Sequence, residues 1–160
     1  MKTRLGFGAL GAGLLAAAIA AGPATGGPDD TARLRELHRK VMEAHRRSDV
    51  AMLLADEAKD GVVVSRGEVL HPTIEERRGM LGPYLGSTRF EEYADVIEPI
   101  VKVSADGTLG WVIVQVRAKG IQTAADGSKK PLEFVSGWIE LYEKRDGTWL
   151  RVGNVSNFKP

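Results

Sequence analysis

Three Asp-Gly dipeptides follow one another at intervals of twenty residues in the second half of the chain. They begin at residues 106, 126 and 146. Asp-Gly between two extended runs is a strong signal for a tight β-hairpin turn. The spacing therefore predicts an antiparallel meander with strands at about 88–104, 108–122, 132–144 and 148–158. Pro99 lies inside the first of these strands, where its missing N–H predicts a bulge or a bend.

The chain before residue 88 carries helical patterns instead. Leu34, Leu37 and Val41 recur at helical spacing, which predicts an amphipathic helix over residues 31–47. Asp49 is placed to cap a second, short helix that ends near residue 57.

A short hairpin and a third helix follow. The β-branched run 62–64, a turn at Arg66-Gly67 and the run 68–70 predict the hairpin. Thr73 and Glu76 form a capping-box pattern that opens the third helix, and Gly82-Pro83 is expected to break or end it. The whole order predicts an α+β fold, in which three helices pack in a strongly bent, mostly antiparallel sheet.

The N-terminus reads as an export signal. Lys2 and Arg4 precede an apolar run from Leu5 to Ala21, and Ala18-Ile19-Ala20 supplies the small residues of a cleavage site. We expect a signal peptide over 1–20, cleaved between residues 20 and 24, a flexible linker over 21–30 and one domain over 31–160. The mature protein is then periplasmic or extracellular in a bacterium, with no stable membrane insertion after cleavage.

Net charge limits the partners that the exported domain can bind, and cysteine content limits how it can be stabilised. Loss of Lys2 and Arg4 leaves 20 basic against 21 acidic side chains, a net charge of −1. Such a chain has no global electrostatic reason to bind nucleic acid. Because it has no cysteine, the exported domain must be stabilised by its core alone.

Four segments resemble those of a known superfamily. They are residues 53–58 (LLADEA), the hairpin and capped helix at 62–82, residues 138–149 (WIELYEKRDGTW) and the last strand at 150–157. This pattern resembles the nuclear transport factor 2-like superfamily, and within it the SnoaL-like proteins, over residues 31–158. The resemblance implies a cone-shaped (cystatin-like) sheet around the helices, a pocket at the open end of the cone and a homodimer.

The superfamily includes isomerases, cyclases and hydrolases, as well as ligand-binding proteins and interaction modules, so its fold alone does not specify a function. Its ketosteroid isomerase-like members use a carboxylate base where this chain has residues 62–65, which contain no acid. Many SnoaL-like members carry histidines in the last strand, where this chain has Gly153, Asn154 and Val155.

The strands of the meander have faces of different character. Trp138 and Glu140 alternate with aliphatic residues along the third strand, as Trp111 and Gln115 do along the second. We assign the aliphatic faces to the core under the helices. The mixed face is then either the back of the sheet, in solvent or a dimer, or a pocket wall on which Glu140 and Gln115 orient a ligand against the tryptophans.

Several further residues are candidates for a site. Glu140 is the candidate catalytic acid or base, because a carboxylate among aromatic rings has a raised pKa. We expect the ligand-binding residues to be His71, Tyr93, Trp111, Gln115, Trp138 and Asn154. His38 and His45 are expected on the surface of the first helix, too far apart for one metal ion, and no metal or cofactor is predicted.

The register of the last hairpin stays open. A two-residue turn at Asp146-Gly147 pairs Trp138 with Val155, whereas a three-residue loop pairs Trp138 with Asn154. The leading hypothesis for function is binding of a small apolar or mixed-polarity molecule. One alternative is an isomerase, cyclase or hydrolase that uses Glu140, and another is a dimeric accessory interaction module.

Overall fold

The computed structural model describes residues 27–159, so the predicted signal peptide and most of the predicted linker lie outside the described residues. The elements are α1 (Pro28–Arg46), α2 (Val50–Leu54), β1 (Glu57–Ser65), β2 (Glu68–Leu70), α3 (Ile74–Ser87), β3 (Thr88–Asp95), β4 (Ile100–Val103), β5 (Leu109–Thr123), β6 (Lys129–Arg145) and β7 (Thr148–Lys159). This order confirms the predicted α+β class. None of the helices in this range has both the length and the apolar character needed to span a membrane.

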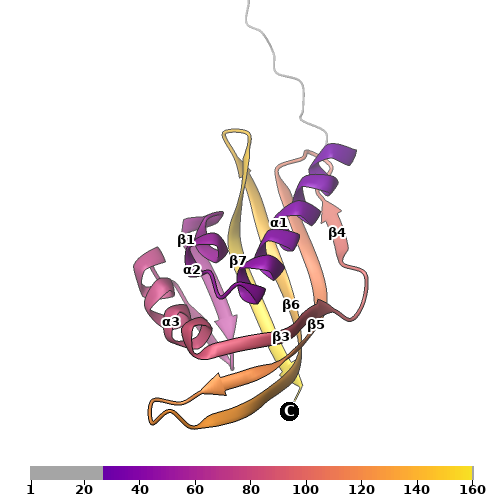
Figure 1. Cartoon of the computed structure of the whole chain (residues 1–160). Coiled ribbons are helices and arrows are strands. Elements are labelled where there is room, and N and C mark those ends of the chain that lie inside the picture. Colours follow the sequence, from indigo (N-terminus) through magenta and orange to yellow (C-terminus); the bar gives the residue numbers. More distant parts are fainter. Residues whose placement is uncertain (1–26, 160) are drawn as a thin grey trace, which may run out of the picture.

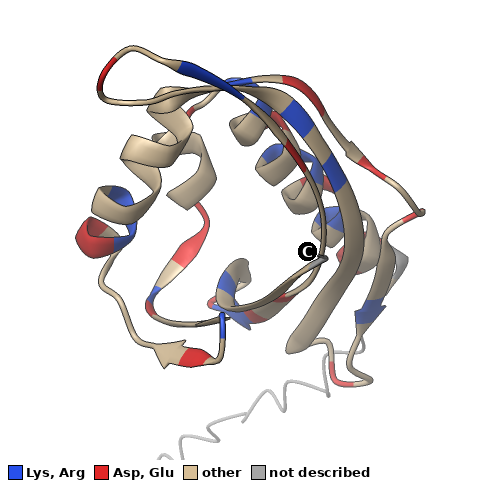
Figure 2. Cartoon of the chain, turned by 90° about the horizontal axis from the view of Figure 1, so that it is seen from below, with Lys and Arg blue, Asp and Glu red and all other residues tan. Residues whose placement is uncertain are grey.

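The strands between residues 27 and 159 form one mixed sheet in the order β2-β1-β7-β6-β5-β3, and β4 also pairs with β5. Neighbouring strands are antiparallel except β1 and β7, which run parallel. Figure 1 shows the sheet bending around α1, with α2 and α3 beside β1. Viewed from below, helices and strands close into a ring around the interior (Figure 2).

The predicted strand over 88–104 is two strands, β3 and β4, separated by residues 96–99. Pro99 has no N–H to donate to a strand ladder, so pairing stops before it and resumes at Ile100. As a result β3 pairs with the C-terminal half of β5 (residues 116–122), and β4 pairs with its N-terminal half (residues 110–113).

The third helix begins as predicted but ends later. The Thr73–Glu76 capping box is present, which confirms that prediction. The expected end at Gly82-Pro83 is wrong, because α3 continues to Ser87 with Pro83 inside it. Pro83 is exposed, so its ring meets solvent, and the next turn is held by Leu85, which is fully buried against Val41. That burial offsets the backbone hydrogen bond that proline removes.

The core lies between α1 and the concave face of the sheet. Leu34, Leu37 and Val41 form the predicted apolar stripe of α1 and are buried. The main cluster joins Leu34 and Leu37 to buried side chains of β5, β6 and β7, including Val112, Val114, Val116, Tyr142 and Trp149.

The pairing of β5 with β6 corrects the predicted faces. Val112 lies opposite Glu140 and Val114 opposite Trp138, so the even-numbered residues of both strands face α1. The odd-numbered residues, including Trp111 and Gln115, project from the outer face. The prediction that these two share a face with Trp138 and Glu140 is therefore wrong, and the aromatic face of β6, not its aliphatic face, covers the core.

The last hairpin follows neither predicted register along its whole length. Asp146 and Gly147 have φ values of 49° and 78°, and Arg145 pairs with Thr148 across this two-residue turn. A bulge between Leu141 and Tyr142 then shifts the register by one residue. Glu140 consequently pairs with Asn154, which puts Asn154 on the interior face.

Candidate functional site

Glu140 is at the centre of a buried hydrogen-bond network inside the cone. Its side chain is fully buried in the middle of β6, beneath α1. One carboxylate oxygen, Oε1, accepts from Trp138 Nε1 at 2.9 Å and contacts His38 Nδ1 at 3.2 Å. The other, Oε2, accepts from the Tyr142 hydroxyl at 2.8 Å. Both oxygens of Glu140 therefore already accept hydrogen bonds from protein groups.

His38 joins Glu140 to a second carboxylate nearer the surface. Its Nε2 lies 3.1 Å from Asp95 Oδ1, while its Nδ1 faces Glu140, and the ring is 2% exposed. Burial by itself would lower the pKa of His38, but the hydrogen bonds and charges of Glu140 and Asp95 outweigh burial and raise that pKa. A protonated His38 donates from both nitrogens, one to each carboxylate.

The same contacts act on Glu140 in the opposite direction. Burial alone would raise the pKa of Glu140, but the hydrogen bond and charge of His38, with the charge of Arg151 and the Trp138 donor, lower it overall. The raised pKa expected for a carboxylate among aromatic rings is therefore wrong for this residue. Glu140 is a buried carboxylate whose ionised form is stabilised by these neighbours.

A cavity of about 740 Å³ occupies the interior beside this network. Its walls are mostly apolar and come from all three helices and from the sheet; they include Val41, Leu53, Leu70, Leu81, Tyr84, Leu132, Phe134 and Trp138. Its exposed charged residues, Arg66, Glu68 and Glu133, mark the rim. Four polar residues lie at the inner end, and we call them the polar floor: His45, Glu140, Arg151 and Asn154.

His45 enters the cavity from the last turn of α1. Its Nδ1 lies 2.8 Å from the Val41 carbonyl oxygen, and its ring stacks on Tyr93 with centroids 4.3 Å apart. Burial lowers the pKa of His45 to about 4; the hydrogen bond to the Val41 carbonyl opposes this shift, and the positive charge of Arg151 adds to it. The imidazole is therefore neutral at neutral pH.

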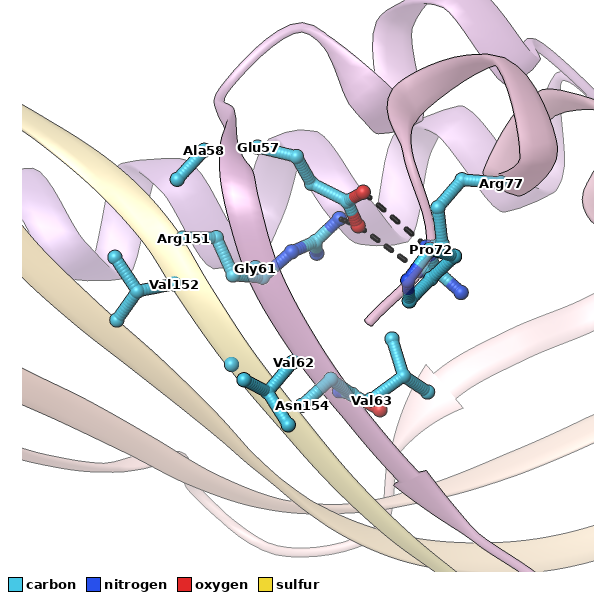
Figure 3. Close-up of a pocket in the computed structure, with 11 residues that line it drawn as sticks. Glu57, Ala58, Gly61, Val62, Val63, Pro72, Arg77, Arg151, Val152 and Asn154 are labelled. Atoms are coloured by element: carbon cyan, nitrogen blue, oxygen red, sulfur yellow. Dashed lines mark hydrogen bonds and ion pairs between the residues drawn. The ribbon is translucent and has the colours of Figure 1, made fainter. Parts of the chain in front are cut away.

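Arg151 closes the inner end of the cavity from β7. Its Nη2 donates to Glu57 Oε1 at 2.6 Å and to the Leu53 carbonyl at 2.9 Å, and Arg77 also binds Glu57 at 2.9 Å (Figure 3). Among the described residues its buried Nε has no hydrogen-bond partner. A space of about 10 Å³ next to this group, between Gly61, Pro72 and Asn154, has room for about one water molecule.

The predicted site residues divide into two groups. Glu140, Tyr93, Trp138 and Asn154 line the cavity together. His71, in contrast, is exposed in the loop between β2 and α3 and does not line it. Trp111 and Gln115 are excluded from the cavity by the β5–β6 register, since both lie on the outer face. The binding role predicted for these three residues has no support in their positions.

Sequence reasoning missed His38, His45 and Arg151. Both histidines were expected on the helix surface, and that expectation is wrong for His38, which is buried, and for His45, which lines the cavity. A signal was present in the sequence: both histidines lie on the same helical stripe as Leu34 and Val41. Within residues 27–159 no group of three histidine or acidic residues is arranged to hold a metal ion.

Comparisons with known proteins identify the fold. No family model and no curated protein matches the chain. Solved structures do match it. A ketosteroid isomerase-like protein from Erwinia carotovora atroseptica is 17% identical with a TM-score of 0.66, over 84% of this chain and 100% of that one.

Two further structures agree. An NTF2-like protein from Cytophaga hutchinsonii is 16% identical with a TM-score of 0.63, covering 83% of this chain and 99% of that one. An NTF2-like protein of unknown function in nutrient uptake from Rhodospirillum rubrum is 17% identical with a TM-score of 0.61, covering 79% and 98%. At these identities the likeness concerns the fold. The chain shares the bent-sheet α+β fold of these NTF2-like structures.

Proposed function

We propose that this chain is an exported domain that binds a small, mainly apolar molecule inside its cone. The observation that carries the proposal is the cavity of about 740 Å³, with apolar walls and a polar floor. Ligand sites in proteins have volumes of about 300–1,000 Å³ and combine hydrophobic walls with a few orienting polar groups. The cavity has both properties.

Binding fits the polar floor better than acid–base catalysis by Glu140. A catalytic acid or base needs a pKa near the working pH and a free edge toward its substrate. Glu140 has a lowered pKa and donors on both oxygens. The alternative of an isomerase, cyclase or hydrolase that uses Glu140 would require a ligand to displace one of those donors.

Native mass spectrometry of the protein purified from the exporting cell tests the binding proposal. We expect a mass excess of a few hundred daltons that collisional activation removes, together with a free small molecule. Bare protein from every preparation, combined with no thermal shift across a library of apolar compounds, would contradict it.

Export is the second part of the proposal and rests on the first twenty residues. Their basic start, apolar run and Ala18-Ile19-Ala20 support secretion. Intact mass measurement of the protein from the periplasm or medium is expected to give a chain that begins between residues 21 and 25. A full-length chain retained in the cytoplasm would contradict export.

A homodimer through the outer face of the sheet is the third part. Leu141 and Val155 are each 39% exposed on this face, next to the half-buried Ile113 and Ile139. A contiguous apolar surface of this kind on a sheet is typical of a protein–protein interface. If the cavity binds no ligand, the alternative function is that of an interaction module, and this outer face would be its binding surface.

A further inference from the structure

The orientation of His45 fixes which of its nitrogens faces the cavity as an acceptor. A carbonyl oxygen only accepts hydrogen bonds, so the nitrogen that contacts the Val41 carbonyl, Nδ1, must carry the proton. In the neutral ring Nε2 then has the free lone pair. The stack on Tyr93 and an edge contact to Phe90 at 6.4 Å hold the ring in this position. His45 is therefore a fixed hydrogen-bond acceptor at the inner end of the cavity.

The charged groups around His45 are paired with one another. The first group contains His38 between Glu140 and Asp95, and the second contains Glu57 between Arg77 and Arg151. The two arginines and His38 thus face three carboxylates, and each of these six groups has a partner within its own group. The charged residues of the rim are exposed to water, where their fields are screened. Figure 2 shows both signs spread over the elements that surround the interior.

This pairing disfavours a charged ligand. An ionised group that enters the cavity leaves water for mainly apolar walls, where the charged side chains are already paired with one another, and such a transfer is costly. An uncharged group that can donate a hydrogen bond, in contrast, finds the unprotonated His45 Nε2 in the lining of the cavity that Arg151 and Asn154 also line.

We propose that the cavity takes an uncharged, mainly apolar molecule bearing a hydroxyl group, an alcohol or a phenol, and that His45 Nε2 accepts the hydrogen bond of that hydroxyl. The proposal rests on the proposed binding function and adds the chemical class of the ligand. The apolar part of the molecule lies along Leu81, Phe134 and Trp138, and the hydroxyl oxygen faces the polar floor.

Three naphthalene derivatives of one shape separate the possibilities by calorimetric titration at pH 7.5. They are 2-naphthol (a donor), 2-methoxynaphthalene (no donor) and 2-naphthoate (an anion). We expect 2-naphthol to bind about 3- to 10-fold more tightly than 2-methoxynaphthalene, as one neutral hydrogen bond would give. We expect 2-naphthoate to be the weakest of the three.

The variant His45→Phe tests the role of the ring nitrogen. Phenylalanine keeps an aromatic ring against Tyr93 but has no acceptor, so the preference for 2-naphthol over 2-methoxynaphthalene should fall to about one-fold, as expected when the single hydrogen bond is lost. The affinity for 2-methoxynaphthalene should be nearly unchanged. His45→Gln, whose side-chain oxygen accepts, is the matched control and should keep part of the preference.

The three ligands test the inference on the wild-type protein alone, so the test stands even if a variant fails to fold. Equal binding of 2-naphthol and 2-methoxynaphthalene would overturn the inference and leave the proposed binding function in place. Tightest binding of 2-naphthoate would overturn it in favour of an anion site at Arg151. If none of the three binds, the proposed function fails, and the inference fails with it.

Discussion

The interior of this cone contains charged residues at full burial, and each is stabilised by specific partners. Glu140 has three donors around it, and His38 has a carboxylate on each side. A buried charge is expensive to remove from water and is tolerated only when such partners are present. Removal of one partner should therefore lower the free energy of unfolding by more than the intact pair contributes, because the remaining charge stays buried without its partner.

Glu140→Gln tests this expectation. The amide keeps the size of the side chain but leaves His38 without its deepest counter-ion, so we expect the free energy of unfolding to fall by about 3 kcal/mol. The pKa of His38 should fall as well, because Glu140 is the stronger of the influences that raise it. Chemical denaturation and an NMR titration of the histidine ring measure the two effects.

The control lies on the same strand. Glu133 is exposed at the rim, and within residues 27–159 its one ion pair is with Lys119 at 3.4 Å. Glu133→Gln should change the stability by no more than about 0.5 kcal/mol. If both substitutions lower the free energy of unfolding equally, the buried network stabilises the protein no more than a surface ion pair does.

The two histidines of α1 respond to pH in opposite directions. The pKa of His45 is lowered to about 4 in the folded state, against about 6.5 in the unfolded chain. Its contribution to stability is present above pH 6.5 and is lost as the pH falls from 6.5 to 4. The pKa of His38 is raised, so its contribution is present below pH 6.5 and is lost as the pH rises through the folded-state value.

We therefore expect the wild-type protein to lose more stability than His45→Phe between pH 7 and pH 4, by at most about 3 kcal/mol. The carboxylates are the same in both proteins, so their contribution cancels in the comparison. Urea denaturation at four or five pH values measures the difference. Parallel curves for the two proteins would mean that His45 titrates normally.

At the scale of elements, close approach of two strands limits the sequence of β5. Gly120 pairs with Phe90 of β3, next to a β-bulge between Phe90 and Glu92. A Cβ at Gly120 would overlap the Arg89 carbonyl oxygen. Any side chain there would push β3 away from the sheet.

Gly120→Ala should consequently destabilise the protein by about 1–3 kcal/mol. Gly137→Ala in β6 is the matched control, because its nearest neighbour would be the Val114 carbonyl oxygen at 3.7 Å, an ordinary contact distance. Thermal unfolding of both variants compares them. A Gly120→Ala protein as stable as the control would contradict the close approach of β3 to β5.

Much of this element structure is predictable from local signals. The Asp-Gly turns, the stripe of α1 and the Thr73–Glu76 capping box act over a few residues, and all of them occur in the structure. The site, in contrast, cannot be predicted from local signals alone. Whether Trp111 or Val112 lies beside Glu140 depends on the register of β5 against β6, and a one-residue slip reverses it.

Long-range contacts explain the other misses. His38 and Glu140 are 102 residues apart in the chain, so no local pattern joins them. The bulge that brings Asn154 to the interior is a feature of the pairing between β6 and β7, between Leu141 and Tyr142, and no local sequence pattern marks it. Pro83 continues a helix because Leu85 beyond it has a buried partner in α1. Each miss concerns a tertiary contact that overrides a local preference.

At the scale of the whole molecule, the outer face of the sheet should determine the oligomeric state. We expect light scattering to give twice the mass of the processed chain, because stable interfaces bury about 1,200–2,000 Å² and this face is broad and apolar. Leu141→Lys places a charge at its centre and should give a monomer. Val69→Lys, on the exposed edge strand β2, should leave the dimer intact. A wild-type monomer at micromolar concentration would contradict the proposed homodimer.

The proposed function depends on the cavity, so a variant that fills the cavity is the sharpest test. Leu132 lines the cavity from β6, whereas Ile113 projects from the outer face of β5. We propose to titrate wild-type protein, Leu132→Trp and Ile113→Trp with the neutral fluorescent probe N-phenyl-1-naphthylamine. We expect one bound probe per chain for the wild-type protein and for Ile113→Trp, and at least about tenfold weaker binding to Leu132→Trp, because steric exclusion of this kind removes more than about 1.4 kcal/mol. Equal binding to all three proteins, or no binding to any, would contradict it.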